Sequence, residues 1–247
     1  VMTPYLWSLV LGAVAGAADL LGAFVLTRKA HWDRSFLRYS LATGAGFMLA
    51  TAFIRMLPES MEKLPHAFFF VLAGYFGIHL FEHTVAPHFH FGEEEHPEAL
   101  LKPSVAYLAV LGVGVHTLFD GVTIASGFLI APSLGLLLFV AVLLHKLPEG
   151  FTIASVMLAS GRSRAAATGA AAILGGSTIV GVLLTALFSQ YVGYALALSA
   201  GVTIYVAASD LIPEVNRERD PRVAWAVFGG LVLFALADWM VSSLGLH

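Results

Sequence analysis

Cysteine is absent from this sequence, and charged residues are few. Asp, Glu, Lys and Arg make up 12% of the 247 residues and hydrophobic residues 58%, whereas a soluble domain averages about 25% charged residues. The missing cysteines exclude disulfides, thiolate metal ligands and thiol catalysis, although they do not identify the compartment. The net charge of -3 argues against nucleic acid as a partner. The composition therefore indicates an integral membrane protein embedded in a lipid bilayer.

Apolar windows of about 20 residues predict eight transmembrane helices. The first lacks a preceding basic region and a following cleavage site, so we expect a span rather than a signal peptide. The connections are short apart from the segment 86–103, which indicates a single transmembrane domain over residues 1–247. The predicted spans are Tyr5–Thr27, Tyr39–Leu57, Ala67–Val85, Val105–Leu129, Leu134–Leu158, Ala165–Phe188, Gly193–Ile212 and Arg222–Leu244.

Basic residues gather in the loops on one side of this predicted bundle. Cytoplasmic loops carry an excess of Lys and Arg, so we expect a cell (inner) membrane protein with both termini outside. Only Arg55 and Lys63 lie towards the other side. The residues of the basic loops are Arg28, Lys29, Arg34, Arg38, Lys102, Arg162, Arg164, Arg217, Arg219 and Arg222.

Two repeated sequence patterns indicate that the chain contains repeated halves. Aligning His116 with His145 superimposes Thr-Ile-Ala-Ser at 123–126 on the same four residues at 152–155. Spans 2 and 7, which run in opposite directions, share a second pattern, so we expect spans 1–3 and 6–8 to be inverted repeats around spans 4 and 5. This 3+2+3 arrangement is typical of alternating-access transporters, and the alternative is chance similarity. The second pattern matches Ala45-Gly46, Ala52 and Pro58-Glu59 with Ala200-Gly201, Ala207 and Pro213-Glu214.

Spans 4 and 5 each carry a histidine and an acid four residues apart: His116 and Asp120, then His145 and Glu149. Residues at i and i+4 share a helix face. Each pair lies roughly 18 Å inside its span at 1.5 Å per residue, near the bilayer midplane, where ionisable side chains by default mark a site or an ion pathway. Two imidazoles and two carboxylates suit Zn²⁺, and also Fe²⁺, Mn²⁺ or Cd²⁺. The alternative is two hydrogen-bonded pairs that hold the bundle together.

Three neighbouring residues bear on this site. Pro148 frees a backbone oxygen inside span 5, which a permeation cavity beside Glu149 would satisfy; a tolerated kink is the alternative. Lys146 must pair or lose its proton, and Asp120 and Glu149 are its candidate partners. We interpret Lys146 as occupying the place of a second cation, against the alternative of a structural ion pair. Met48 in span 2 could supply a soft thioether contact or simply fill the core.

The order of these motifs resembles the ZIP (Zrt-, Irt-like protein) family of divalent-metal transporters, in its prokaryotic type. His-x-x-x-Asp-Gly and His-x-x-Pro-Glu-Gly in consecutive spans look like the metal-binding helices of that family. Gly46-Phe-Met-Leu-Ala-Thr-Ala-Phe with Leu57-Pro-Glu resembles its second helix, and Gly201-Val-Thr-Ile-Tyr205 with Leu211-Ile-Pro-Glu214 resembles its seventh. The resemblance covers nearly the whole chain.

The resemblance implies metal uptake into the cytoplasm by an elevator-like or rocking motion, with no enzyme activity. The ion would bind between spans 4 and 5, at His116, Asp120, His145 and Glu149, and Met48 matches the second-helix ligand position. Family members with a second metal use an Asn after the helix-4 His, an acid after the first helix-5 ligand and an acid from helix 6. Here these positions hold Thr117, Lys146 and a span 6 with no acid, which resembles the mononuclear variety.

Other polar residues are weaker candidates for a role in transport. Asp210 and Glu214 are exit candidates near the inner end of span 7, and Glu59 could attract cations at the outer mouth. Each could equally be a solvated interfacial acid. Further polar residues in or near spans are Asp19, His79, Glu82, His83 and Asp238.

The segment 86–103 carries His88, His90 and His96 together with the run Glu93-Glu94-Glu95. Histidine-rich tracts bind metal, so this cytoplasmic loop could receive or sense the emerging ion; a solvated acidic loop is the alternative.

The sequence thus predicts a transporter of divalent transition-metal ions, foremost zinc. The alternatives are an intramembrane zinc metalloenzyme, for which no separate general base or nucleophile stands out, and a metal-sensing or structural membrane protein without flux. A homodimer is left open.

Overall fold

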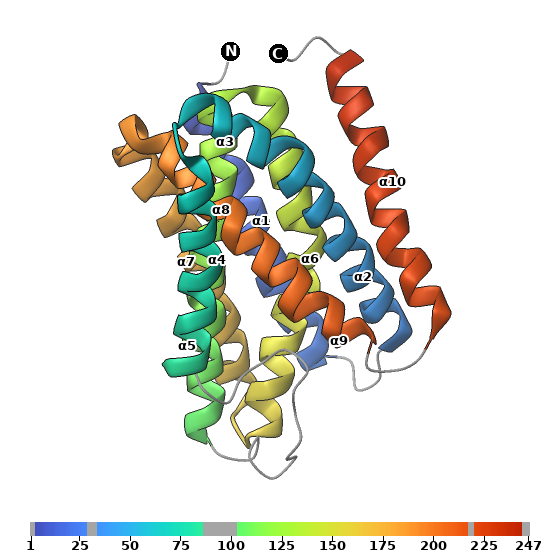
Figure 1. Cartoon of the computed structure of the whole chain (residues 1–247). Helices are drawn as coiled ribbons and strands as arrows, with labels where there is room; N and C mark the ends of the chain where they lie inside the picture. The colour runs from blue at the N-terminus through green and yellow to red at the C-terminus, as the bar shows by residue number, and fades with distance from the viewer. Residues whose placement is uncertain (1–2, 29–33, 86–102, 217–219, 244–247) are drawn as a thin grey trace.

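The computed structural model describes residues 3–28, 34–85, 103–216 and 220–243, and every regular element in these ranges is helical (Figure 1). The described part holds seven helical stretches long and apolar enough to cross a membrane. An eighth helix, α4 (Ala67–Thr84), ends in the polar turn Glu82-His83-Thr84 and occupies the third predicted span. The prediction of an all-α, multi-pass membrane protein is therefore confirmed.

Six of the predicted spans are single helices. Ser163 caps one of them, α7, by accepting a hydrogen bond from the backbone N–H of Ala166 at 3.2 Å, as expected of a serine before a helix. The six helices are α1 (Pro4–Arg28), α4, α5 (Pro103–Ile130), α6 (Pro132–Ala159), α7 (Arg164–Leu187) and α10 (Pro221–Ser243).

The second and seventh spans are each interrupted by a wider π-helical segment. The second comprises α2 (Arg34–Thr51), η1 (Ala52–Met56) and α3 (Leu57–Lys63). The seventh comprises α8 (Val192–Tyr205), η4 (Val206–Leu211) and α9 (Ile212–Asn216), after a short 3₁₀ turn, η3 (Ser189–Tyr191).

A proline follows each of these π-helical segments. Pro58 and Pro213 each follow the segment closely, four residues after Ile54 and Ser209 respectively. Because proline has no N–H to donate to the carbonyl four residues earlier, that carbonyl loses its α-helical partner, and a π-bulge is one local solution.

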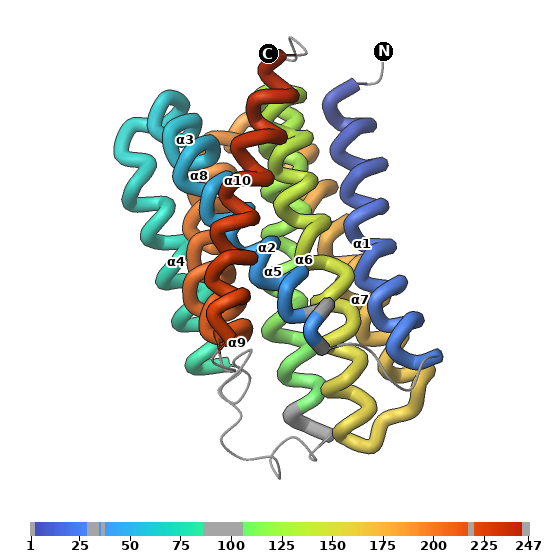
Figure 2. The backbone as a smooth tube through the Cα atoms, turned by 90° about the vertical axis from the view of Figure 1, so that its right-hand side faces the viewer, coloured from blue at the N-terminus to red at the C-terminus, as the bar shows by residue number. Residues whose placement is uncertain are grey.

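Helices α5 and α6 form the centre of the bundle and pack against each other (Figures 1 and 2). Around them, α1 packs on α6 while α7 packs on α5, and α2 packs on α10 while α4 packs on α8. Glycines allow the second set of contacts, because a Cβ at Gly46 would collide with the backbone of Val227, and one at Gly201 with that of Val71. Small residues let membrane helices approach in this way.

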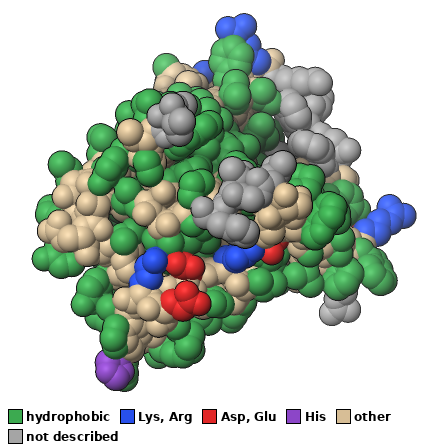
Figure 3. Space-filling model, turned by 90° about the horizontal axis from the view of Figure 1, so that it is seen from above, with side chains coloured by type: hydrophobic (Ala, Val, Ile, Leu, Met, Phe, Trp, Pro, Cys, Tyr) green, Lys and Arg blue, Asp and Glu red, His purple; other side chains and the backbone are tan. Residues whose placement is uncertain are grey.

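Polar contacts join helices at both ends of the bundle, and Arg55 pairs with Asp238 at the end where α10 ends. At the end where α4 ends and α5 begins, Asp220 accepts hydrogen bonds from the Tyr39 hydroxyl at 2.8 Å, from Arg38 Nη2 at 3.2 Å and from the backbone N–H of Arg222 at 2.9 Å. These bonds join the starts of α2 and α10. The opposite end, where α1 begins and α10 ends, shows mostly hydrophobic side chains with a few charged ones among them (Figure 3).

Large apolar side chains cover the flanks of the bundle. Phe69 on α4 and Trp225 on α10 expose 72% and 74% of their surface. Such extended apolar surface is expected where a protein contacts a membrane.

Candidate metal centre

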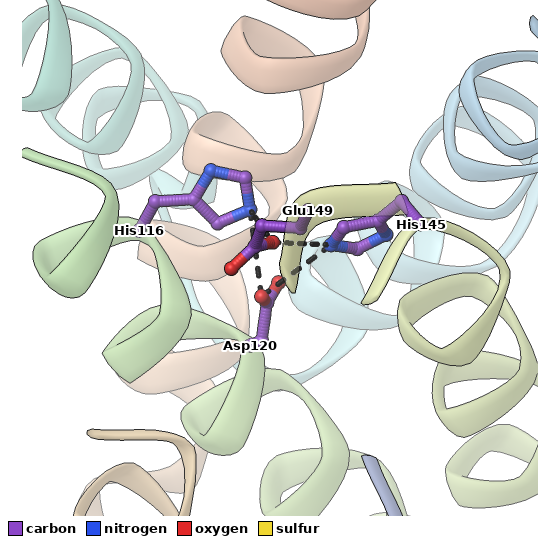
Figure 4. A group of neighbouring side chains, drawn as sticks. All are labelled: His116, Asp120, His145 and Glu149. Carbon is purple, nitrogen blue, oxygen red and sulfur yellow. Dashed lines mark hydrogen bonds and ion pairs between the residues drawn. The ribbon is translucent and has the colours of Figure 1, made fainter. Parts of the chain in front are cut away.

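Four buried nitrogen- and oxygen-bearing side chains meet between α5 and α6. His116 and Asp120 lie one turn apart on α5, and His145 and Glu149 one turn apart on α6. The four side chains point at one another (Figure 4), and one ligand atom of each lies within 4.8 Å of the others. Each histidine lies about 20 Å from the first residue of its helix at 1.5 Å rise, so the group sits at mid-depth in the bundle.

The distances between these atoms suit a metal ion. Asp120 Oδ2 lies 3.4 Å from the Nε2 atoms of both His116 and His145. Glu149 Oε2 lies 3.7 Å from His145 Nε2 and 3.9 Å from His116 Nε2. Ligands about 2.0–2.2 Å from a tetrahedral zinc ion are about 3.4 Å from one another. The sequence prediction that these two turns share one face of each helix and converge is thus confirmed in geometry.

Hydrogen bonding fixes which nitrogen of His145 could bind a metal. Its Nδ1 lies 3.1 Å from the carbonyl oxygen of Ala141. A carbonyl only accepts hydrogen bonds, so Nδ1 carries a hydrogen. Nε2, which lies 3.4 Å from Asp120 Oδ2, is then the nitrogen whose lone pair a neutral ring would offer to a metal. Ring orientation by a backbone carbonyl is common for metal-ligating histidines.

Two ligand atoms in the group lack hydrogen-bond partners among the described residues. They are His116 Nε2 and Glu149 Oε2, both buried. Buried polar atoms are normally satisfied, and here two of them face each other across the position that an ion would occupy. A divalent cation at that position would satisfy both.

Lys146 contacts the carboxylates of the same group. Its fully buried ammonium lies 2.9 Å from Asp120 Oδ2 and 3.1 Å from Glu149 Oε1, the two partners predicted from the sequence. A third carboxylate, that of Asp19 on α1, lies 3.5 Å away. Sequence reasoning placed Asp19 only among weak candidates. The sequence signal for Asp19 is a lone acid in the middle of an apolar span. Such an acid needs a partner, and the Lys146 ammonium in span 5 could supply one.

The other predicted site residues pack in the apolar core or bond within their own helix. Met48 on α2 is 2% exposed and belongs to the apolar cluster that joins α2, α6, α8 and α10. The hydroxyl of Thr117 donates to the carbonyl of Gly114 within α5 at 3.0 Å. Pro148 lies buried inside a helix that continues from Pro132 to Ala159. A ligand role for Met48 therefore stays a prediction.

One of the predicted pathway residues adjoins the four-residue group. Asp210 on η4 is 5% exposed and lines a small cavity with three of the four. Glu214 follows on α9, beyond η4, and Glu59 forms an i,i+4 ion pair with Lys63 at 3.2 Å. The cavity is lined by Leu41, His116, His145, Glu149, Val206, Asp210 and Leu211. The predicted loop candidates His88, His90 and His96 lie outside the described residues.

Comparison with known proteins identifies the family. The model of the ZIP zinc transporters matches residues 3–104 and 92–238. The chain belongs to the ZIP family. The sequence-based assignment to this family is confirmed, and so is the expectation of a transporter rather than an enzyme, because ZIP proteins are transporters.

Curated relatives agree with this assignment along nearly the whole ZIP chain. A zinc transporter ZupT from Escherichia coli O81 (strain ED1a) is 29% identical over 264 aligned positions, which cover 96% of this chain and 98% of the relative. A ZupT from Salmonella heidelberg (strain SL476) is 30% identical, with the same coverage. A ZupT from Escherichia coli O7:K1 is 31% identical over 87% of this chain and 88% of its own length.

Proposed function

We propose that this protein transports divalent transition-metal ions, foremost Zn²⁺, and that the transported ion binds between α5 and α6. The ligands are His116, Asp120, His145 and Glu149. One observation carries the proposal: four buried ligand atoms converge, and two of them find no hydrogen-bond partner in the described part of the chain. The ZIP family and the zinc transporters named among its relatives support zinc. Cd²⁺, Fe²⁺ and Mn²⁺ fit the same ligands.

Lys146 makes the proposed site mononuclear. Its ammonium contacts Asp120 Oδ2, the oxygen that also contacts both histidines, and Glu149 Oε1. A second metal ion beside these two carboxylates would need deprotonated ligands of its own and would lie against the positive charge of the Lys146 ammonium. Thr117, which neighbours His116, directs its hydroxyl into its own helix.

The proposed direction of transport is into the cytoplasm, across the inner membrane. Basic residues favour the cytoplasmic side, and the described ones mark the end of the bundle at which α4 ends and α5 begins, so both termini would lie outside. Asp210 and Glu214 lie on the way from the proposed site to that end, and Glu59 lies towards the opposite one. The basic residues concerned are Arg28, Arg38, Arg162, Arg164 and Arg222.

Alternating access by inverted halves accounts for several matched features. The π-helical segments Ala52–Met56 and Val206–Leu211 include the echoed residues Ala52 and Ala207. Helix pairs α2–α10 and α8–α4 pack alike, as do α1–α6 and α7–α5. These equivalences support a 3+2+3 arrangement of spans in one transmembrane domain, with the ion between the two halves.

Uptake into proteoliposomes tests the proposal. Purified protein in liposomes should admit Zn²⁺ or Cd²⁺, and His145→Ala should abolish uptake while the protein remains folded. His66→Asn is the matched control, because it removes a histidine that is exposed and far along the chain from the site, and Asn tolerates the left-handed backbone (φ 65°) found there. Uptake that persists in His145→Ala would remove the assignment.

A further inference from the structure

Lys146 and the proposed metal ion compete for the same carboxylates. Asp120 Oδ2, which contacts both imidazoles, is also the oxygen closest to the Lys146 ammonium. Glu149 divides its oxygens, with Oε1 on Lys146 and Oε2 towards the histidines. A divalent ion bound at Oδ2 would therefore lie within a few ångströms of the ammonium, where like charges in a buried site repel strongly.

Asp19 is the one described carboxylate beside Lys146 that is not a proposed ligand. It is fully buried, and its Oδ2 lies 3.5 Å from the ammonium. Within the described ranges neither of its oxygens accepts a hydrogen bond. A buried carboxylate in that condition is costly, so its place needs an explanation beyond packing.

The backbone holds Asp19 where it is. A Cβ at Gly150 would collide with the carbonyl of Asp19, and one at Gly22 with the carbonyl of Leu147. Helices α1 and α6 thus touch on both sides of this position. The Lys146 side chain, by contrast, is a flexible four-carbon stem, so the ammonium can move while the Asp19 carboxylate stays.

The other half of the molecule offers an internal comparison. Gly121 packs on the backbone of Thr178 as Gly150 packs on that of Asp19. In the alignment of His116 with His145, Thr117 is the counterpart of Lys146. Asp19 and Lys146 therefore occur together, on α1 and α6. Threonines stand at both equivalent positions on α7 and α5. The hydroxyls of Thr117 and Thr178 each donate to a carbonyl of their own helix. This co-occurrence indicates that Asp19 interacts with Lys146 and is not needed for helix packing in general.

We propose that Asp19 is a positioning residue that receives the Lys146 ammonium when a divalent ion binds Asp120 and Glu149. The inference rests on the proposed function. Lys146 then acts as a displaceable internal cation: it neutralises the ligand carboxylates until the ion arrives and moves to Asp19 afterwards. Without Asp19 the ammonium has no other carboxylate to move to among the described residues, so it stays on the ligands and opposes the ion.

A double-mutant cycle in Cd²⁺ affinity tests this role. Equilibrium binding of Cd²⁺ to purified protein is compared for the wild type, Asp19→Asn, Lys146→Met and the double variant. We expect Asp19→Asn to weaken binding about 10-fold or more, within the range for residues that orient ligands. In the Lys146→Met background the same substitution should change affinity less than about two-fold. Thr178→Val is the matched control, since it alters the equivalent position in the other half, and should bind as the wild type does.

Two outcomes separate the inference from the proposed function. A wild type that binds no Cd²⁺ contradicts the proposed function itself. A wild type that binds Cd²⁺, with an equal loss on Asp19→Asn in the presence and absence of Lys146, contradicts only the positioning role and indicates a simple charge effect.

A structure with Cd²⁺ bound covers the case in which Lys146→Met fails to fold. Lys146 Nζ should then lie within hydrogen-bond distance of Asp19 and away from Asp120 Oδ2. An ammonium still on Asp120 and Glu149 beside the bound ion would overturn the inference.

Discussion

Gly150 lies directly against the backbone carbonyl of Asp19, one residue after the proposed ligand Glu149. The contact is between two backbones, so no side-chain rotation could make room for a methyl group. We expect Gly150→Ala to push α1 from α6, to cost roughly 1–3 kcal/mol or more of stability, and to weaken Cd²⁺ binding. Thermal unfolding in detergent measures the first effect and equilibrium binding the second.

Gly176→Ala is the control for this substitution, because Gly176 lies on α7 with open space around its Cα. An alanine in a helix interior is up to about 1 kcal/mol more favourable than glycine, so this variant should match or exceed the wild-type Tm. Equal Tm values for Gly150→Ala and Gly176→Ala would show that the α1–α6 contact is loose enough to accommodate an added methyl group.

Glu149→Gln should abolish uptake, because it removes a charged ligand while keeping the side-chain volume. Loss of an orienting partner alone costs 10–100-fold in metal affinity, so loss of this ligand should weaken Cd²⁺ binding by at least about 100-fold. Lys146 retains Asp120 and Asp19 as partners, and the variant should therefore still fold. Glu62→Gln, on the exposed surface of α3, is the control, and comparable affinity in the two variants would contradict the ligand role.

Met48→Leu tests whether a thioether takes part in binding. Leucine has nearly the volume of methionine, so the apolar cluster should lose less than about 1.5 kcal/mol. A soft thioether favours soft ions, and we expect the substitution to lower Cd²⁺ uptake more than Zn²⁺ uptake. Competition between the two ions in proteoliposomes measures this preference, and an unchanged ratio would leave Met48 as core filling.

Asp220→Asn should reduce stability in a pH-dependent manner. The N–H of Arg222, the Tyr39 hydroxyl and the nearby arginines hold the pKa of Asp220 below its usual value. A carboxyl whose pKa is depressed in the folded state stabilises the protein above its unfolded pKa of about 3.9, and this contribution is lost as the pH falls through the lower folded pKa. The variant should melt below the wild type at pH 7, with the gap narrowing in acid below about pH 4. A gap that stays constant across this range would contradict the mechanism.

Much of the bundle could be predicted because each span is a long apolar run, and the site because His116 and Asp120 recur as His145 and Glu149 at the same depth. Helical periodicity fixes which residues share a face, so the turns of α5 and α6 could be paired from the sequence alone. The prolines after η1 and η4 were visible in the sequence, but hydropathy does not reveal how a chain widens around them.

Asp19 shows what periodicity could not predict. Its role depends on which helix packs against α6, and that contact is made by Gly22 and Gly150, which carry no hydropathy signal. The same holds for Asp210, whose place beside the four-residue group depends on the packing of η4. Pairings across helices are set by small residues and backbone contacts, which the sequence pattern of one span does not contain.

The widened turn at Val206–Leu211 also sets the rotational phase of the two helical flanks that it joins, α8 and α9. An α-helix advances about 100° per residue, so shortening this segment by one residue would rotate one flank of the span against the other by that angle. Either Tyr205 and its neighbours or the acids Asp210 and Glu214 would then face a different helix. A single inserted residue can in this way determine which neighbouring helix the side chains of an entire half-helix face.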